Sequence, residues 1–295
     1  MKTSSVLSGD ALILFTMAIF ASSPLFFRFN PNIPVALFLA AFQIVGALCF
    51  FFIAKYQGIP TLSRYEYILL GTLALAAVLN DLCYFFALRL TSVANAAVGH
   101  QSVSLFLLVL SPIFLKEKTT RAEWLVLVVS IVGIVLLYSD GLEGATGDDH
   151  LLGITLAVIS GFFYASIIIL YRIIPAHNRT LTIPVINFWR YTISCILLLP
   201  FINVVTFHTV GSTDIVTLVL FGFIFAVIAS GIHNHAISMT RSLHVSILGK
   251  SEPVFAVIYS MVFLHETPKV SAVVGGAFII IPSLWLMLYG KKEQS

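Results

Sequence analysis

The chain has 295 residues, of which 59% are hydrophobic and only 10% charged, and its mean hydropathy is +1.02. Soluble domains have about 45–50% apolar and about 25% charged residues, so the composition excludes an ordinary soluble domain and predicts an integral membrane protein. The net charge of +3 does not point to nucleic acid, because membrane proteins place Lys and Arg in cytoplasmic loops. The lipid bilayer is therefore the first expected partner.

The N-terminal apolar run "ALILFTMAIFASS" (11–23) resembles a signal peptide, but Asp10 before it and an internal repeat favour a first helix that is retained. Cys49, Cys83 and Cys195 lie in apolar runs without CxxC or metal-ligand spacing. They are predicted to be small packing residues, and no metal or other cofactor is expected.

Apolar windows of about 20 residues recur along the chain, each long enough to cross a bilayer as a helix. Their borders predict ten transmembrane helices at 9–28, 33–54, 66–88, 91–115, 121–138, 151–174, 181–205, 213–236, 242–264 and 270–290. The predicted fold class is therefore an all-α membrane protein, without room for a soluble domain between the spans.

The basic residues predict the orientation of these spans. With both termini cytoplasmic, the inner segments hold Lys2, Lys55, Arg64, Lys116, Lys118, Arg121, Arg172, Arg179, Arg241, Lys291 and Lys292, and the outer ones hold Arg28, Arg89 and Lys269. The acidic stretch "SDGLEGATGDDH" (139–150) has no Lys or Arg and is expected to be an outer loop. We expect a multi-pass protein of the cell (inner) membrane.

The two halves of the chain, 1–145 and 146–295, resemble each other at a shift of about 144 to 150 residues. Gly9, Leu12, Ala21, Ser22 and Arg28 match Gly153, Leu156, Ala165, Ser166 and Arg172, and Ala87, Thr91, Ser102 and Glu117 match Ala236, Thr240, Ser251 and Glu266. Five spans per copy would make the second copy enter the membrane from the opposite side. Such inverted repeats are typical of secondary transporters, whose substrate site lies near the midplane between the copies.

Charged residues within predicted spans are costly, by about 2.5–3.5 kcal/mol each on insertion scales, and so mark candidate sites. They are Asp81, Arg190, Lys250 and Glu252. Lys250 and Glu252 are two residues apart, about 200° around a helix, so both cannot face one cavity. Pro253 is expected to kink the helix and to free the carbonyl of Gly249.

At a shift of 149 residues, Lys250 corresponds to Gln101, which places two polar residues at equivalent positions of the two halves. One interpretation is a substrate site at the pseudo-symmetric centre. The other is that Lys250 only neutralises Asp81 or Glu252 in a structural pair.

Further candidates lie close to these positions. Asn80, Asp81 and Tyr84 fall within one helical turn and form a polar patch, which either faces substrate or bonds neighbouring helices. His100 is either a proton-titrating group or a hydrogen-bonded packing residue. Tyr164 could stack on a substrate.

Two other features allow opposite interpretations. Arg190 either extends toward the membrane surface or binds an anionic group. In "HNH" (233–235) the two imidazoles point to opposite faces of a helix, and no Cys or carboxylate has zinc-like spacing, so a metal site is not expected.

Three segments resemble the drug/metabolite transporter superfamily, and specifically its EamA-type ten-helix members. They are "SEPVFAVIYSMVFLHE" (251–266), its counterpart "SVSLFLLVLSPIFLKEK" (102–118) and "YFFALRLTSVANAAVGHQ" (84–101). Many relatives have Pro in the middle of the fourth helix, where this chain has Ser104. The resemblance implies a secondary carrier with a central cavity that moves amino acids or other small metabolites, often outward.

The leading hypothesis is an exporter of a small polar or zwitterionic metabolite, with Asp81 and Glu252 meeting an ammonium and Lys250 or Arg190 a carboxylate. Protons are a candidate coupling ion, through His100, Asp81 or Glu252. The alternative is an importer or exchanger of an organic anion or nucleotide-like metabolite. An intramembrane enzyme is not expected, because the sequence has no HExxH, GxSxG or paired catalytic carboxylates.

Overall fold

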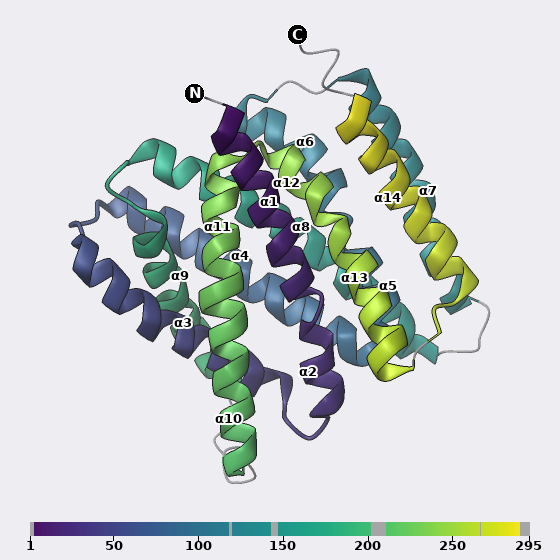
Figure 1. Ribbon diagram of the computed structural model, residues 1–295, viewed down its shortest axis with the longest axis horizontal. Coiled ribbons are helices and arrows are strands. Elements are labelled where there is room, and N and C mark those ends of the chain that lie inside the picture. The colour runs from purple at the N-terminus through teal and green to yellow at the C-terminus, as the bar shows by residue number, and fades with distance from the viewer. Residues whose placement is uncertain (1–2, 118–119, 143–146, 202–210, 266, 290–295) are drawn as a thin grey trace.

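The computed structural model describes all residues except 1–2, 118–119, 143–146, 202–210, 266 and 290–295, and the described residues form helices without any strand. The helices pack side by side, and most of them run from one end of the molecule toward the other (Figure 1). The α-helices of the first half are α1 Thr3–Phe20, α2 Ser23–Phe29, α3 Val35–Gln57, α4 Arg64–Leu90, α5 Val93–His100, α6 Val103–Leu115 and α7 Arg121–Leu142. Those of the second half are α8 Gly147–His177, α9 Ile183–Leu198, α10 Ser212–Phe221, α11 Ser230–Met239, α12 Ser242–Gly249, α13 Ser251–Tyr259 and α14 Val270–Tyr289. A short 3₁₀ turn η1 (Leu199–Phe201) and two π-helical segments, η3 (Gly222–Ala229) and η4 (Ser260–Leu264), complete the described elements.

Helical segments occupy each of the ten predicted windows. Six continuous stretches of the described residues are long and apolar enough to cross a membrane: Gly9–Phe29, Val35–Gln57, Arg64–Leu90, Asn95–Leu115, Asp149–His177 and Ser212–Met239. The prediction of a loop over 139–150 is wrong in extent, because α7 continues to Leu142 and α8 already begins at Gly147. Acidic residues near a helix N-terminus stabilise it, which accounts for the early start of α8.

Several windows that were predicted as single helices are interrupted. The first breaks between α1 and α2, where Pro24 begins the second segment. The fourth breaks at Gln101 and Ser102, and the ninth breaks at Lys250. The break at Gln101 needs no proline, because Ser102 Oγ instead donates a hydrogen bond to the carbonyl of Val158 on α8 at 3.0 Å.

Gly161 of α8 permits this close approach. A Cβ at this position would lie 2.2 Å from Ser102 Oγ and 2.9 Å from the carbonyl oxygen of His100. Both contacts are far inside van der Waals distance, so only glycine fits where the broken fourth span crosses α8.

Backbone geometry repeats between the halves. Lys116 and His265, 149 positions apart, end α6 and η4 and are the only non-glycine residues with positive φ among those described, at 55° each. Arg28 donates to the carbonyl of Thr91 at 3.1 Å, and the matching Arg172 donates to the carbonyl of Thr240 at 2.8 Å. The sequence repeat is thus also a structural repeat.

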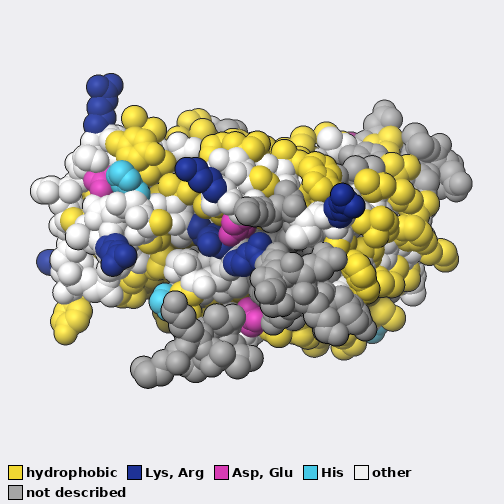
Figure 2. All heavy atoms as spheres, turned by 90° about the horizontal axis from the view of Figure 1, so that it is seen from above, with side chains coloured by type: hydrophobic (Ala, Val, Ile, Leu, Met, Phe, Trp, Pro, Cys, Tyr) yellow, Lys and Arg dark blue, Asp and Glu magenta, His cyan; other side chains and the backbone are white. Residues whose placement is uncertain are grey.

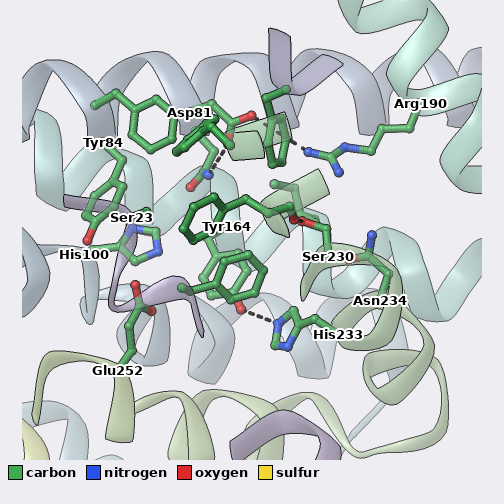
Figure 3. A pocket seen from close by; sticks show the side chains of 17 residues that line it. Ser23, Asp81, Tyr84, His100, Tyr164, Arg190, Ser230, His233, Asn234 and Glu252 are labelled. Carbon is green, nitrogen blue, oxygen red and sulfur yellow. Dashed lines mark hydrogen bonds and ion pairs between the residues drawn. The ribbon is translucent and has the colours of Figure 1, made fainter. Parts of the chain in front are cut away.

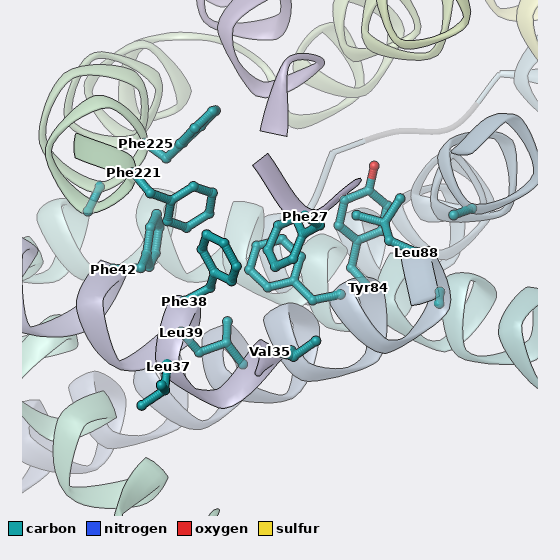
Figure 4. Close-up of a cluster of buried hydrophobic side chains, with 14 of the residues drawn as sticks. Phe27, Val35, Leu37, Phe38, Leu39, Phe42, Tyr84, Leu88, Phe221 and Phe225 are labelled. Atoms are coloured by element: carbon teal, nitrogen blue, oxygen red, sulfur yellow. The ribbon is translucent and has the colours of Figure 1, made fainter. Parts of the chain in front are cut away.

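The halves pack against each other along their whole length. α4 lies against α8, α3 against α9, α7 against α14 and α1 against α11. A cluster of buried aromatic rings joins the halves, with Phe27 and Phe38 from the first and Phe221 and Phe225 from the second (Figure 4). The ring centroids of Phe27 and Phe38 are 4.5 Å apart, and those of Phe38 and Phe221 are 5.1 Å apart.

The start of α1 and the end of α14 lie at the same end of the molecule (Figure 1). Several Lys and Arg side chains gather on that end, with acidic side chains among them (Figure 2). One ion pair, between Arg172 Nη1 and Glu117 Oε1 at 3.0 Å, ties the end of α6 to α8, and Ser242 Oγ also donates to Glu117. Glu266, the predicted counterpart of Glu117, lies outside the described residues.

Candidate functional site

A cavity of about 110 Å³ lies between the two halves, midway along the helices (Figure 3). Both halves and the broken helices contribute side chains. The lining residues are Phe20, Ser23, Phe42, Asn80, Asp81, Tyr84, Phe85 and His100 from the first half, and Tyr164, Ile167, Arg190, Phe221, Phe225, Ser230, His233, Asn234 and Glu252 from the second.

Asp81 and Arg190 form an ion pair at one side of the cavity, with Arg190 Nη2 3.8 Å from Asp81 Oδ2. The carboxylate also accepts hydrogen bonds from Gln43 at 3.1 Å and Asn80 at 3.0 Å. The guanidinium lies over the ring of Tyr191, 4.5 Å from its centroid. These contacts offset the cost of burying both charges, and they fix Arg190 in the cavity wall.

Arg190 is 5% exposed, so the interpretation in which it extends toward the membrane surface is wrong. Its Nε hydrogen is buried without an acceptor among the described residues. A buried donor without a partner is unfavourable, whereas a guanidinium binds a carboxylate through a fork of parallel N–H groups. The guanidinium thus has one N–H group that neither Asp81 nor any other described residue accepts.

Glu252 enters the cavity from the start of α13, on the opposite side from Arg190 (Figure 3). Its side chain is buried, and it makes no hydrogen bond or ion pair with any described residue. A buried carboxylate without a partner costs several kcal/mol, so Glu252 requires a proton, a cationic ligand or water in the cavity.

Tyr164 and His233 form a chain of hydrogen bonds across the cavity. Thr16 Oγ1 donates to the carbonyl of Ile13 at 2.8 Å, so its remaining contact, 3.1 Å from His233 Nδ1, has the imidazole N–H as donor. His233 Nε2 is then an acceptor for the hydroxyl of Tyr164, 2.6 Å away. With this tautomer of His233, the Tyr164 oxygen has only acceptor capacity left for the cavity.

The same reasoning applies to His100. Ser160 Oγ donates to the carbonyl of Ala157 at 2.6 Å, so His100 Nδ1–H donates to Ser160 Oγ at 2.7 Å. His100 Nε2 is left as a bare acceptor, with the rings of Tyr84 and Tyr164 at centroid distances of 4.8 and 5.1 Å. His100 is therefore an ordered residue of the cavity wall, and its Nε2 makes no hydrogen bond with a described residue.

Lys250 and Gln101 do not line the cavity. Lys250 is fully buried, and its Nζ donates to the backbone carbonyl of Gln101 at 2.7 Å. Gln101 Nε2 donates in return to the carbonyl of Gly249 at 3.3 Å, the group that Pro253 was predicted to free. The structural pair of Lys250 with Asp81 is a wrong interpretation, because the ion-pair partner of Asp81 is Arg190.

A helix terminus accounts for a lysine buried this deeply. Gln101 is the C-cap of α5, where backbone carbonyls carry the negative end of the helix dipole. Lys250 thus binds the C-terminal end of α5, at the break in the fourth span, and it does so from the break in the ninth. The two breaks hold each other at equivalent positions of the repeat.

The structure brings seven of the nine predicted site residues to one cavity: Asn80, Asp81, Tyr84, His100, Tyr164, Arg190 and Glu252. Sequence reasoning missed Ser23, Ser230, His233 and Asn234. The "HNH" motif was the available signal: His233 is buried and His235 exposed, in line with the predicted opposite faces, and the buried imidazole contacts Thr16 and Tyr164. No group of three metal-binding side chains occurs within the described part of the chain.

The model of the EamA-like transporter family matches residues 7–139 and again 151–289, so the chain belongs to this family. An uncharacterized transporter of Clostridium kluyveri is 25% identical over 76% of this chain and 74% of that protein. Another, of Archaeoglobus fulgidus, is 23% identical over 91% of this chain and 93% of that protein. A solved crystal structure with 17% identity covers 98% of this chain and 99% of that one at a TM-score of 0.67, and it shows the same fold. The protein is a membrane transporter.

Proposed function

We propose that this transporter carries a small zwitterionic metabolite, an amino acid or related compound, outward by alternating access. The observation that carries the proposal is that one buried cavity offers the unpartnered carboxyl group of Glu252 on one side and the unused Nε hydrogen of Arg190 on the other. A substrate ammonium would meet Glu252, and its carboxylate would meet Arg190. The outward direction is supported by the resemblance of the chain's motifs to EamA-type carriers.

Alternating access follows from the proposed topology. Ten spans would form two inverted five-helix repeats, 1–145 and 146–295, with both termini on the cytoplasmic side of the cell (inner) membrane. The Lys and Arg side chains on the end that carries the termini support this orientation (Figure 2). Rocking of one repeat against the other would open the cavity to each side in turn.

The size of the cavity supports a small substrate. At about 110 Å³ it is below the roughly 300–1,000 Å³ of typical ligand pockets, so this conformation resembles a closed state. The cavity also carries two acidic side chains, Asp81 and Glu252, against one basic side chain, Arg190, among the described lining residues. This balance supports a zwitterion more than an organic anion or a nucleotide-like metabolite.

Proton coupling is part of the proposal. Glu252 and the bare Nε2 of His100 are proton acceptors at the same cavity, and a proton on Glu252 would compete with a substrate ammonium. Lys250 and Gln101 would act as positioning residues, because their hydrogen bonds orient the start of α13 and hence Glu252.

The test is counterflow of radiolabelled solutes into proteoliposomes that contain the purified full chain. The solutes are neutral amino acids, their amides, the matching 2-hydroxy acids, and nucleotides. The amides lack the carboxylate, and the hydroxy acids lack the ammonium. We expect uptake of at least one amino acid, with more than tenfold less for its amide and hydroxy acid. Glu252→Gln should abolish this selectivity for the ammonium, and His235→Gln, an exposed neighbour of the site, should not. Uptake of the hydroxy acid or a nucleotide in preference to every amino acid would contradict the proposal.

A further inference from the structure

A second and larger cavity, of about 610 Å³, lies at the end of the molecule opposite the start of α1 and the end of α14. It shares no lining residue with the central cavity. Its walls come from the end of α2, the junction of α4 and α5, the start of α8 and the segment between η4 and α14, whose lower ends lie together in Figure 1. The lining residues are Arg28, Arg89, Leu90, Thr91, Ser92, Asn95, His150, Ser260, His265, Thr267, Pro268 and Lys269.

The described lining of this second cavity is basic. Arg28, Arg89 and Lys269 line it together with two histidines, and no Asp or Glu is among the described lining residues. Arg89 is anchored by the backbone, because its Nη1 and Nη2 donate to the carbonyls of Pro31 at 3.2 Å and Ile33 at 3.0 Å. Carbonyl oxygens orient the guanidinium but do not neutralise its charge, so Arg89 can attract an anion from this wall. Two carboxyl groups adjoin the lining residues in the sequence: Asp149, next to His150, and Glu266, which lies outside the described residues.

Three buried polar side chains form another part of the wall. Thr91 Oγ1 lies 2.8 Å from His150 Nδ1, and Asn95 Nδ2 lies 3.4 Å from both Thr91 Oγ1 and His150 Nε2. Asn95 is 2% exposed, and its Oδ1 has no hydrogen-bond partner within the described chain. A buried acceptor without a donor is unfavourable, so a ligand that brings an O–H or N–H group would be stabilised there.

We propose that this second cavity is a binding site for a small anion, a carboxylate or phosphate, that also carries an O–H or N–H donor. Lys269 and Arg89 bind the anionic group, and Asn95 Oδ1 accepts the donor. The chemistry fits two sources: a solute such as a hydroxy acid or hydrogen phosphate, and a lipid headgroup that joins a phosphate to an ammonium. The proposal is independent of the central cavity and of the substrate proposed for it.

Calorimetric titration of the delipidated, purified full chain tests the site with glycolate, which has a hydroxyl group, and acetate, which has none. The wild type should bind glycolate more tightly than acetate by at least threefold. Lys269→Gln should weaken both at least tenfold, and Asn95→Leu should remove the preference for glycolate but keep acetate binding. Lys116→Gln, a change of the exposed lysine that ends α6, should change neither.

Equal binding of both anions by the wild type, Lys269→Gln and Asn95→Leu would overturn the proposal. So would loss of binding in Arg190→Lys alone, because the anions would then occupy the central cavity. Thermal unfolding of each variant checks that Asn95→Leu folds, and Asn95→Asp offers a second change of the same acceptor, expected to repel both anions. Native mass spectrometry with phosphatidylethanolamine and phosphatidylcholine distinguishes the two sources. If the protein retains only phosphatidylethanolamine, and Lys269→Gln reduces that retention, the site binds lipid. If the protein retains neither lipid, the site binds a solute.

Discussion

Lys250 Nζ donates a hydrogen bond of 2.7 Å to the carbonyl of Gln101, the residue 149 positions earlier in the chain. The side chain of Gln101 returns a bond to Gly249, so the breaks in two repeat-related spans are joined by crossed contacts. The side chain that the sequence marked as the candidate centre of the site therefore joins the breaks beside the cavity.

The first prediction concerns this pair. Lys250→Met should lower transport at least tenfold while changing the free energy of unfolding by only about 1 kcal/mol, because removing a buried charge offsets the lost hydrogen bond. Gln101→Leu should have a similar effect on transport. The double variant should transport no worse than either single one, since both break the same junction. Lys116→Met is the control. If the fold-losses of transport in the two single variants multiply in the double variant, the two residues act separately.

The second prediction concerns Asp81 and Arg190. Asp81→Asn or Arg190→Met should each destabilise the protein by on the order of 3 kcal/mol, because each leaves a buried charge without its partner. The double variant should recover most of this lost stability. Transport should be abolished in both single variants and in the double variant. Thermal unfolding in detergent measures the cycle, and strictly additive losses would show that the two charges do not stabilise each other.

The third prediction concerns protons. Amino acid flux into proteoliposomes should respond to an imposed pH gradient in the wild type, and Glu252→Gln should keep measurable flux that no longer responds. The reason is that the amide cannot bind or release the proton that competes with the substrate ammonium. Thr72→Val, an exposed change elsewhere on α4, is the control. Equal gradient dependence in Glu252→Gln would move the coupling to another group, with His100 as the next candidate.

The fourth prediction concerns topology. In a chain with Cys49, Cys83 and Cys195 replaced by Ala, a membrane-impermeant thiol reagent should label Asp149→Cys on intact cells and leave Arg179→Cys unlabelled. Both positions are exposed, so access from one side of the membrane decides the result. Permeabilised cells should label both, which confirms reactivity. Labelling of Arg179→Cys alone would reverse the orientation.

The fifth prediction concerns the aromatic core between the halves. Phe221 is fully buried against rings of both halves, and Phe221→Ala should cost about 3–5 kcal/mol of stability. Phe223 is two residues away and 46% exposed, so Phe223→Ala should cost much less. Thermal unfolding compares the two, and equal losses would contradict the burial of Phe221.

The windows of helix and the paired positions of the repeat were predictable, because hydropathy and the shift of 144 to 150 residues are carried by local composition. The broken fourth span was not, since its break depends on Gly161 of α8 and the hydroxyl of Ser102 instead of a proline. Intramembrane charge marked Asp81, Arg190 and Glu252, which line the central cavity. The direction of Lys250 was not predictable, because its partner is a backbone carbonyl, which every residue has. His233 was seen as a motif but could not be placed without Thr16 and Tyr164.

The π-helical segment η3 sets the direction in which the side chains of the eighth span point around the helix axis. Phe221 and Phe225 before and within it, and His233 and Asn234 after it, all face the cavity. Ser230 Oγ donates to the carbonyl of Phe225, five residues back, as expected for the wider turn. The wider turn takes in one more residue than an α-helical turn, so an unbroken α-helix over Gly222–Ala229 would place every residue beyond it about 100° further around the axis and change which side chains reach the cavity. The extra residue therefore acts as a phase shift that lets one helix present an aromatic face and a polar face to the same small space.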